Sequence, residues 1–165
     1  MTYRARVVTV STRAADRVEV DYRDTAGPAG AEILTAWGFA VDEVVLVPDG
    51  PAVGGALRDA VSAGVNLVVT CGGTGIAAGD STPEQTRAVI DFEVPGIAEL
   101  MRARSWDGVP TAVLSRGLSG VAGSTLIVNL PGSASAVREC LTWLSGVLPH
   151  ACHQLAGGDH ERSDQ

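Results

Sequence analysis

Short apolar runs recur along the chain and predict a set of buried strands. Each run is rich in valine, leucine or isoleucine, and its apolar residues are nearly consecutive instead of alternating with polar ones. That pattern is typical of strands covered on both faces, as in a parallel sheet. The predicted strands are Ala5–Val10, Val41–Val47, Val65–Thr70, Thr111–Leu114 and Leu126–Asn129.

Predicted helices alternate with these runs. Pro51 opens one of them, and glycine follows the end of that helix, at Gly64, and of another, at Gly38, as is usual at helix boundaries. The predicted helices are Gly27–Trp37, Pro51–Ala63, Pro83–Phe92, Gly96–Ser105 and roughly Ser135–Leu148. Alternating strands and helices predict right-handed βαβ units, and so a single three-layer α/β/α domain with a mostly parallel sheet.

Composition narrows the class of protein. The chain has 165 residues, of which 45% are hydrophobic, enough for one core. We expect the domain to take in residues 1–156 and residues 157–165, "GGDHERSDQ", to form a polar C-terminal tail. The sequence has no apolar run of about 18 residues and no signal-peptide pattern, so we expect no membrane association. Three cysteines without a CxxC spacing favour the cytoplasm.

Charge excludes several mechanisms. The net charge is −7, which argues against nucleic acid as a partner. All twelve basic residues are arginine, so a Schiff-base lysine and a P-loop lysine are both excluded.

The glycine spacing argues against a dinucleotide-binding site. A GxGxxxG spacing begins at Gly73, after a later strand, whereas the dinucleotide fingerprint needs GxGxxG after the first strand. An NAD enzyme is therefore not expected.

A glycine-rich loop follows the strand that ends at Thr70, in "TCGGTGIAAGDSTPEQT" (residues 70–86). Its glycines are Gly72, Gly73, Gly75 and Gly79. Glycine allows positive φ, so backbone N–H groups can converge on an anion. Thr82 is a predicted N-cap, with Gln85 completing a capping box. A merely tight turn is the alternative, but four glycines with a polar exit favour a ligand loop.

Two carboxylates lie at predicted strand ends. Asp49 follows Val41–Val47 in "PDG", and Asp80 lies in the glycine loop. Ligands bind at the carboxyl ends of strands in open α/β sheets, and paired carboxylates there suit Mg²⁺ bridging to phosphate. "PDG" is also an ordinary turn, so both readings of Asp49 stay open.

Two further polar segments follow predicted strands. Residues 115–124, "SRGLSGVAGS", follow the predicted strand Thr111–Leu114, and residues 129–135, "NLPGSAS", lead into the last helix. The amino end of that helix favours anions. Small and polar residues at several strand ends predict a cleft for a phosphate-bearing ligand.

These residues together resemble the MogA/MoaB family of molybdopterin adenylyltransferases. The matching motifs are "GGTG" (72–75), "D-x-TPE" (80–84), "PG-x-x-E-x-MR" (95–102), "LSR" (114–116), "LIVNLPGS" (126–133), "EC" (139–140) and "LPHA" (148–151). "PDG" (48–50) and "SxR" (11–13) also fit. The resemblance spans residues 5 to 156, and the motifs occur in the family's order.

The resemblance implies a function and its partners. Members of the family transfer AMP from ATP to the molybdopterin phosphate and release pyrophosphate, with Mg²⁺. It also implies a homotrimer, with hand-over of the product to a molybdenum-insertion protein. The pterin phosphate is itself the nucleophile, so catalysis would rest on positioning and charge neutralisation.

The resemblance also implies site residues. Asp49 and Asp80 correspond to the catalytic and metal-binding carboxylates. The substrate-binding residues would be Ser11, Gly72, Gly73, Thr74, Gly75, Ser115, Gly120, Asn129, Pro131, Gly132 and Ser133.

The chain departs from the family pattern at two positions. Gly79 stands where a basic residue usually precedes the loop aspartate, and Ala134 stands where proline usually follows "NLPGS". The missing cation favours an alternative: a MoaB-type paralogue that binds pterin or nucleotide with weak or no catalysis. A scaffold trimer that passes pterin to a partner enzyme is another. Both retained aspartates favour the enzyme.

Two features look chemical but favour a structural role. His150, Cys152 and His153 in "PHACH" fall within the family's terminal helix, which argues against a zinc site. Cys71 abuts the glycine loop without a basic neighbour in sequence, so a small half-buried residue is expected there.

Overall fold

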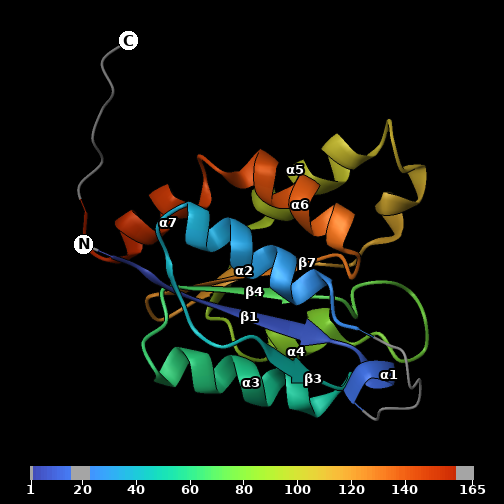
Figure 1. Ribbon diagram of the computed structural model, residues 1–165, viewed down its shortest axis with the longest axis horizontal. Coiled ribbons are helices and arrows are strands. Elements are labelled where there is room, and N and C mark those ends of the chain that lie inside the picture. Colours follow the sequence, from blue (N-terminus) through green and yellow to red (C-terminus); the bar gives the residue numbers. More distant parts are fainter. Residues whose placement is uncertain (1, 16–22, 159–165) are drawn as a thin grey trace.

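Parallel strands form the centre of a seven-stranded sheet in the computed structural model, which describes residues 2–15 and 23–158 (Figure 1). The strands are β1 (Arg4–Val10), β2 (Ala40–Val41), β3 (Val45–Val47), β4 (Leu67–Cys71), β5 (Phe92–Glu93), β6 (Ser119–Ala122) and β7 (Thr125–Leu130). Their order is β2-β1-β4-β7-β6-β5, and β3 also pairs with β1. Pairing is parallel from β2 to β7 and antiparallel where β6 meets β7 and β5.

Helices cover both faces of this sheet, which confirms the predicted three-layer domain. They are α1 (Thr12–Ala15), α2 (Ala26–Ala36), α3 (Pro51–Ser62), α4 (Thr82–Arg87), α5 (Pro95–Ser105), α6 (Ala134–Leu144), α7 (Leu148–Leu155) and the 3-10 helix η1 (Pro110–Leu114). Figure 1 shows α2, α5, α6 and α7 on one face and α3 and α4 on the other. No helix in the described ranges combines the length and apolar character that crossing a bilayer requires.

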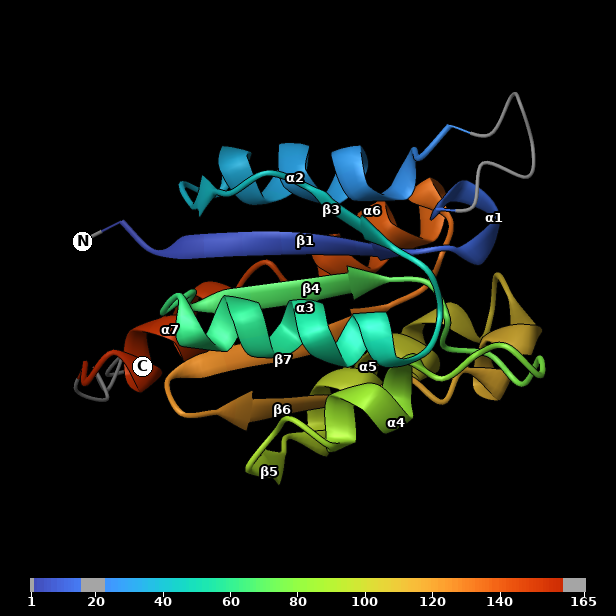
Figure 2. The same cartoon turned by 90° about the horizontal axis from the view of Figure 1, so that it is seen from below.

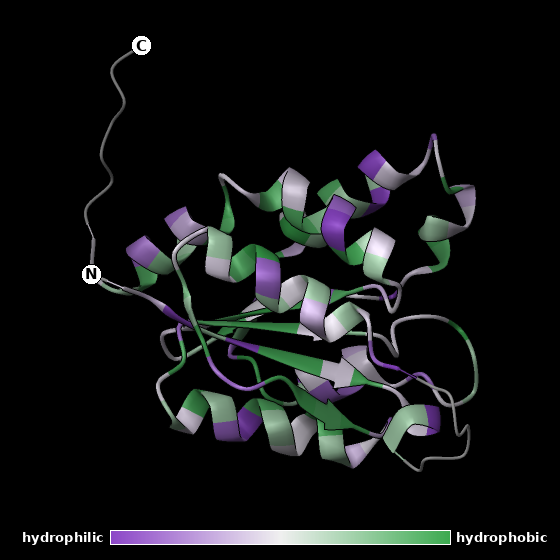
Figure 3. Ribbon diagram, viewed as in Figure 1, coloured by the Kyte–Doolittle hydropathy of each residue, from purple (hydrophilic) through white to green (hydrophobic). Residues whose placement is uncertain are grey.

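Alternate residues of β1 enter two separate cores. Ala5 and Val7 face the layer of α2 and α6, whereas Val8 and Val10 face α3. Figure 3 shows the strands as a largely apolar layer between the helices. Full burial of one such side chain stabilises the fold by about 1.5–3 kcal/mol. This explains why the strand runs lack the alternation of a half-exposed sheet.

One predicted element differs in kind from what forms, and two strands were not predicted. The prediction of a strand over Thr111–Leu114 is wrong, because these residues belong to η1. Pro110 fixes its own φ and lacks an N–H, which favours a turn start over a central strand. The apolar character of Val113 and Leu114 indicated burial, but both side chains are exposed. Strands β5 and β6 were not predicted, since both are short and β6 is made of small residues.

Other predicted elements have shifted boundaries. Val41–Val47 is not one strand, because residues 42–44 separate β2 from β3. The predicted helix from Pro83 ends at Arg87, and Phe92 lies in β5. The last predicted helix, Ser135–Leu148, corresponds to α6, which ends at Leu144, and only Leu148 lies in α7. Of the predicted C-terminal tail, residues 159–165 lie outside the described residues.

Strand register brings four strand ends to one edge. Thr9 pairs with Cys71, Val10 with Val47, and Cys71 with Leu130. The carboxyl ends of β1, β3, β4 and β7 therefore lie side by side. In Figure 2 the arrowhead of β4 points to this edge and that of β6 points away.

Asp42, in the segment between β2 and β3, holds the sheet edge through two arginines of β1. Its Oδ2 lies 3.0 Å from Arg4 Nη2 and 2.9 Å from Arg6 Nη2. Burial raises the pKa of Asp42, but the two guanidinium groups outweigh burial and hold the pKa below its ordinary value of 3.8. A lowered carboxyl pKa adds stability above the unfolded-state pKa, and this stability is lost as pH falls through the folded-state pKa.

We therefore expect Asp42→Asn to lower the free energy of unfolding by about 1 kcal/mol at neutral pH. The difference from wild type should shrink as pH falls below the ordinary carboxyl pKa, because the wild-type carboxylate then takes up a proton. Urea denaturation at several pH values measures this difference, with Glu43→Gln as the neighbouring control. A difference that does not vary with pH would show that the ion pairs contribute nothing.

Candidate active site at the carboxyl edge of the sheet

The glycine loop leaves β4 through a space too narrow for any side chain. Gly72 and Gly73 have φ values of 110° and 65°, a region that L side chains rarely adopt. A Cβ on Gly72 would lie 2.4 Å from the carbonyl oxygen of Val10. The Gly72 N–H donates to Leu130 O at 3.1 Å, so the turn is fixed between the ends of β1 and β7.

The other two loop glycines serve different purposes. The prediction of positive φ is right for Gly72 and Gly73 and wrong for Gly75 and Gly79. A Cβ on Gly75 would lie 2.7 Å from Asp80 Oδ2, so glycine makes room there for the carboxylate. A Cβ on Gly79 would meet no atom within 4 Å.

Asp49 presents an unpaired oxygen to this loop. Its Oδ2 accepts from the Thr12 hydroxyl at 3.0 Å, and its N–H donates to the same hydroxyl at 3.1 Å. Its Oδ1 is buried without a hydrogen-bond partner, and a Cβ on Gly73 would lie 2.6 Å from it. A buried acceptor without a partner is costly, which suits an atom that awaits a cation or a donor.

Asp80 lies on the same loop. Its Oδ2 accepts from the Ala77 N–H at 3.2 Å, and it packs against Gly75. Besides Asp49 Oδ1, Ser81 Oγ is the other buried side-chain nitrogen or oxygen atom of the described residues without a hydrogen-bond partner. The structure thus gathers both predicted carboxylates and both unpaired atoms around one loop.

The start of α4 differs from the predicted capping box. The N-cap is Ser81, and its side chain makes no capping bond. The Thr82 hydroxyl instead donates to Gly72 O at 3.0 Å. Thr82 is fully buried, so it closes the glycine loop from beneath instead of capping the helix.

A buried polar network continues from Thr82 to Asn129. The Thr86 hydroxyl donates to Thr82 O at 2.8 Å. Asn129 Nδ2 donates to Thr86 Oγ1 at 2.9 Å and to Thr70 Oγ1 at 3.1 Å, while its Oδ1 accepts from Leu118 N–H at 3.2 Å. The side chain of Asn129, a predicted substrate contact, is thus committed to the core.

A pocket of about 370 Å³ opens beside the glycine loop. It lies between α5, η1, the end of β7 and the start of α6. The lining includes five predicted residues: Ser115, Asn129, Pro131, Gly132 and Ser133. Sequence reasoning had not singled out its other main contributors, Met101, Arg102, Glu139 and Cys140, although the "MR" and "EC" motifs contained them.

Two features give this pocket polarity. Arg102 Nη1 donates to Gly117 O at 3.0 Å, so its guanidinium is held at the wall. Ser133 caps α6, since its Oγ accepts from Ala136 N–H at 3.2 Å, and both residues line the pocket. The positive end of the α6 dipole therefore lies at the pocket wall.

Two predicted substrate contacts lie elsewhere. Gly120 is in the middle of β6, where a Cβ would lie 2.6 Å from Phe92 O, and it does not line the pocket. The lack of a side chain at Gly120 lets β5 and β6 lie close together. Ser11 follows β1 at the site edge, where its Oγ accepts from Ala14 N–H at 3.3 Å and its N–H donates to Val47 O. Thr74 lies in the glycine loop and is largely buried.

The surroundings of Cys71, Cys140 and His153 indicate a structural role and not a catalytic one. Burial, with a smaller contribution from Asp24, raises the pKa of Cys71 far above its ordinary value, and burial chiefly raises the pKa of Cys140 to about 11. Both thiols are therefore neutral and poor nucleophiles. His153 Nδ1 lies 3.0 Å from the Tyr3 hydroxyl. Within residues 2–15 and 23–158, no three His, Cys, Asp or Glu side chains form a metal-binding group.

Comparison with known proteins supplies the family context. Residues 6–150 match the family model described as "Probable molybdopterin binding domain". The chain is 46% identical to a molybdopterin adenylyltransferase of Helicobacter pylori over 92 residues, which is 56% of this chain and 52% of that protein. It is 42% identical to one from Haemophilus influenzae over 143 residues, covering 82% of this chain and 69% of that protein.

A solved structure resembles the chain over nearly all of both molecules. The molybdopterin biosynthesis Mog protein of Mycobacterium ulcerans superposes with a TM-score of 0.88 at 50% identity, covering 95% of this chain and 99% of that one. Among the curated relatives, the chain spans only about half the length of the H. pylori protein, 52%.

We expect Asn129→Ala to lower the free energy of unfolding by about 2–4 kcal/mol, because the buried Leu118 N–H and Thr70 hydroxyl lose their bonds to Asn129 and the Thr86 hydroxyl loses a donor. Urea denaturation measures the loss. Thr142→Ala is the control, since its hydroxyl donates to Arg138 O at 2.8 Å on an exposed surface and should cost about 0.5 kcal/mol or less. Equal losses in the two variants would contradict the network.

Proposed function

The chain belongs to the probable molybdopterin binding domain family, and on that premise we propose that it is a molybdopterin adenylyltransferase. It transfers AMP from ATP to the phosphate of molybdopterin and releases pyrophosphate. Relatives named for this activity and Mog-type structures support the proposal.

One observation carries the proposal: the buried, unpaired Oδ1 of Asp49 faces a glycine loop whose first residues have positive φ. Backbone amides in such loops bind phosphate. A carboxylate oxygen without a partner would repel a phosphate unless a cation lay between them. The presence of this carboxylate beside a phosphate-binding loop therefore favours metal-assisted phosphate transfer over simple anion binding.

Asp49 and Asp80 suit Mg²⁺. The ion prefers oxygen ligands and is often held by one or two carboxylates together with substrate phosphates, so a cluster of three protein ligands is not required. Bound there, Mg²⁺ would neutralise charge that develops on the transferring phosphate. The groups that would hold the ion are Asp49 Oδ1 and the Asp80 carboxylate.

The reaction needs no protein nucleophile. A phosphate oxygen of molybdopterin attacks the α-phosphorus of ATP, a new P–O bond forms, and the bond to the β-phosphate breaks to release pyrophosphate. The attacking phosphate already carries negative charge, so no general base is needed. The chain's contribution is to hold the two phosphates in line through the glycine loop and the amino end of α6.

The pocket beside the loop suits the pterin. Its volume of about 370 Å³ falls in the range of small-molecule sites. Pro131 and Gly132 line it directly after β7, next to Gly72. A ring placed there would have its phosphate within reach of the glycine loop.

Further assignments extend the proposal. A homotrimer and hand-over to a molybdenum-insertion protein follow from the family resemblance. The three cysteines are free, which suits a reducing compartment such as the cytoplasm.

A second candidate is a pterin- or nucleotide-binding protein with weak or no catalysis. Gly79 favours it, because this position is exposed and carries no cation where one would lie near phosphate. A scaffold that passes pterin onward is the related possibility.

The assay that decides between them uses purified chain, molybdopterin and MgATP. Formation of adenylylated pterin with equimolar pyrophosphate would support the enzyme. Binding of molybdopterin without pyrophosphate release would favour the second candidate.

We expect Asp49→Asn and Asp80→Asn each to lower kcat by about a hundredfold or more, since each removes negative charge that holds the metal at the reacting phosphate. Single-turnover assays measure the loss, and circular dichroism checks the fold. Asp59→Asn, in the last turn of α3 and so at the end of that helix away from Asp49, is the control. Near-normal rates in both site variants would remove the metal assignment.

We expect Gly79→Arg to tighten molybdopterin binding a few-fold, because one exposed cation near phosphate is worth roughly 0.5–1 kcal/mol. The backbone tolerates the change, since φ is not positive and a Cβ meets no atom within 4 Å. Titration at low and high salt should show the gain shrinking with salt. Gly146→Arg, at an equally open turn between α6 and α7, is the control. Weaker binding at every salt concentration would contradict a role for charge here.

A further inference from the structure

Arg116 binds the glycine loop at several points although it lies outside that loop in sequence. Its N–H donates to Thr74 O at 2.8 Å, and its Nε donates to Gly75 O at 2.7 Å. Its Nη2 donates to Asp80 O at 2.8 Å, and its Nη1 pairs with Glu84. One residue thus connects both ends of the segment 74–80 to the start of α4.

All three guanidinium nitrogens of Arg116 bond to the protein. Each of its three nitrogens donates to a group of the loop or of α4. Burial raises the pKa of Glu84, but a backbone hydrogen bond and Arg116 outweigh it, so the pKa lies below its ordinary value. Glu84 is therefore ionised at neutral pH and neutralises the guanidinium.

The outer part of the loop has few other attachments. Ile76 is 68% exposed. Residues Ala77 and Asp80 bond each other, with Asp80 N–H donating to Ala77 O at 3.0 Å and Ala77 N–H donating to Asp80 Oδ2. These bonds shape a turn but do not fix it to the body of the fold. The Asp80 carbonyl and Gly75 carbonyl are fixed by Arg116.

We propose that Arg116 is a positioning residue: it fixes residues 74–80 and so places the Asp80 carboxylate for the transfer reaction. The inference rests on the proposed function for its catalytic part. Arg116 acts through the loop and does not touch the reacting atoms.

A rival role for Arg116 is that of a phosphate-binding cation, and the two roles make different demands on the side chain. A phosphate-binding cation is partly replaced by lysine, which keeps the charge. A residue that holds the loop by several directional bonds, here called a clamp, is not replaced by lysine. The lysine ammonium cannot make three directional bonds from one plane. Arg116→Lys and Arg116→Met should therefore be equally impaired if Arg116 is a clamp.

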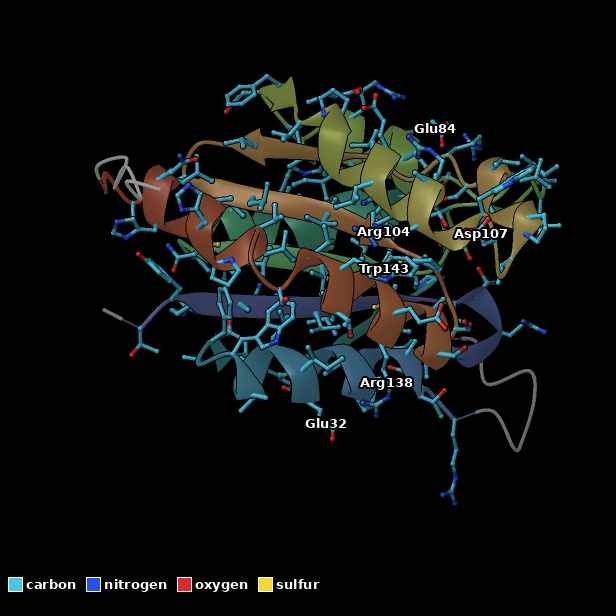
Figure 4. The ribbon with its side chains drawn as sticks, turned by 90° about the horizontal axis from the view of Figure 1, so that it is seen from above. Glu32, Glu84, Arg104, Asp107, Arg138 and Trp143 are labelled. Atoms are coloured by element: carbon cyan, nitrogen blue, oxygen red, sulfur yellow. The ribbon has the colours of Figure 1, made fainter. Side chains whose placement is uncertain are left out.

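The experiment combines a structural and a kinetic readout on Arg116→Lys and Arg116→Met. Hydrogen exchange of the amides of residues 74–81 reports the clamp without reference to activity. Steady-state assays with molybdopterin and MgATP give kcat and KM. Arg138→Lys is the matched control, because Arg138 Nη2 pairs with Glu32 at 2.8 Å on an exposed surface. Figure 4 shows that pair on α6 and α2, away from Glu84.

We expect both Arg116 variants to exchange about tenfold faster over residues 74–81 and to lose about ten- to a hundredfold in kcat, with KM changed less than threefold. The Arg138 control should match wild type in both readouts. Circular dichroism and urea denaturation check that the fold persists.

Each contrary result has a separate meaning. Unchanged exchange over residues 74–81 would overturn the clamp. Faster exchange with normal kcat, or rescue of kcat by lysine but not methionine, would overturn the positioning role. Absence of transfer by the wild-type protein would overturn the proposed function and the catalytic part of this inference, whereas the exchange result would still decide the clamp.

Discussion

Three backbone segments meet where β4 ends, and the geometry of the site depends on that crowding. A Cβ on Gly72 would lie 2.4 Å from Val10 O, and one on Gly132 would lie 3.3 Å from the Cα of Gly72. Parallel register brings the ends of β1, β4 and β7 this close together. Because no side chain fits between them, the ligand-facing surface there is made of backbone, whose amides can bind phosphate without side-chain charge.

Beneath that backbone surface, buried polar side chains hold the loop in place by hydrogen bonds. Thr82 bonds Gly72 O from below, and Thr86 and Asn129 continue the chain of bonds into β7. All three side chains are buried. Above the surface, Arg116 bonds the loop carbonyls from the solvent side. The loop is thus held from two sides, by Thr82 at its own end and by Arg116, which is distant in sequence.

Local patterns predicted much of this fold and less of the site. The buried strands β1, β4 and β7 were predictable because both faces are apolar, and α2 and α3 because glycine and proline mark their ends. The error over Thr111–Leu114 arose because apolar residues near a binding pocket look like a strand core. Asn129 was expected to contact substrate because of the family resemblance, and no local pattern reveals its bonds to Thr70 and Thr86, which depend on long-range packing. Gly120 was carried over from the same resemblance, and its place in a strand was not predicted because β6 is too short to show a pattern.

The burial of all three thiols has a practical consequence. Cys71 lies in β4, Cys140 in α6 and Cys152 in α7, and each is at most 1% exposed. An alkylating reagent can reach each sulfur only after the element that carries it separates from its neighbours. Mass spectrometry of labelled peptides would then time three opening events in one native chain, without any introduced probe. Cys140 borders the pocket, so its labelling would also report how a bound ring slows the local opening of α6.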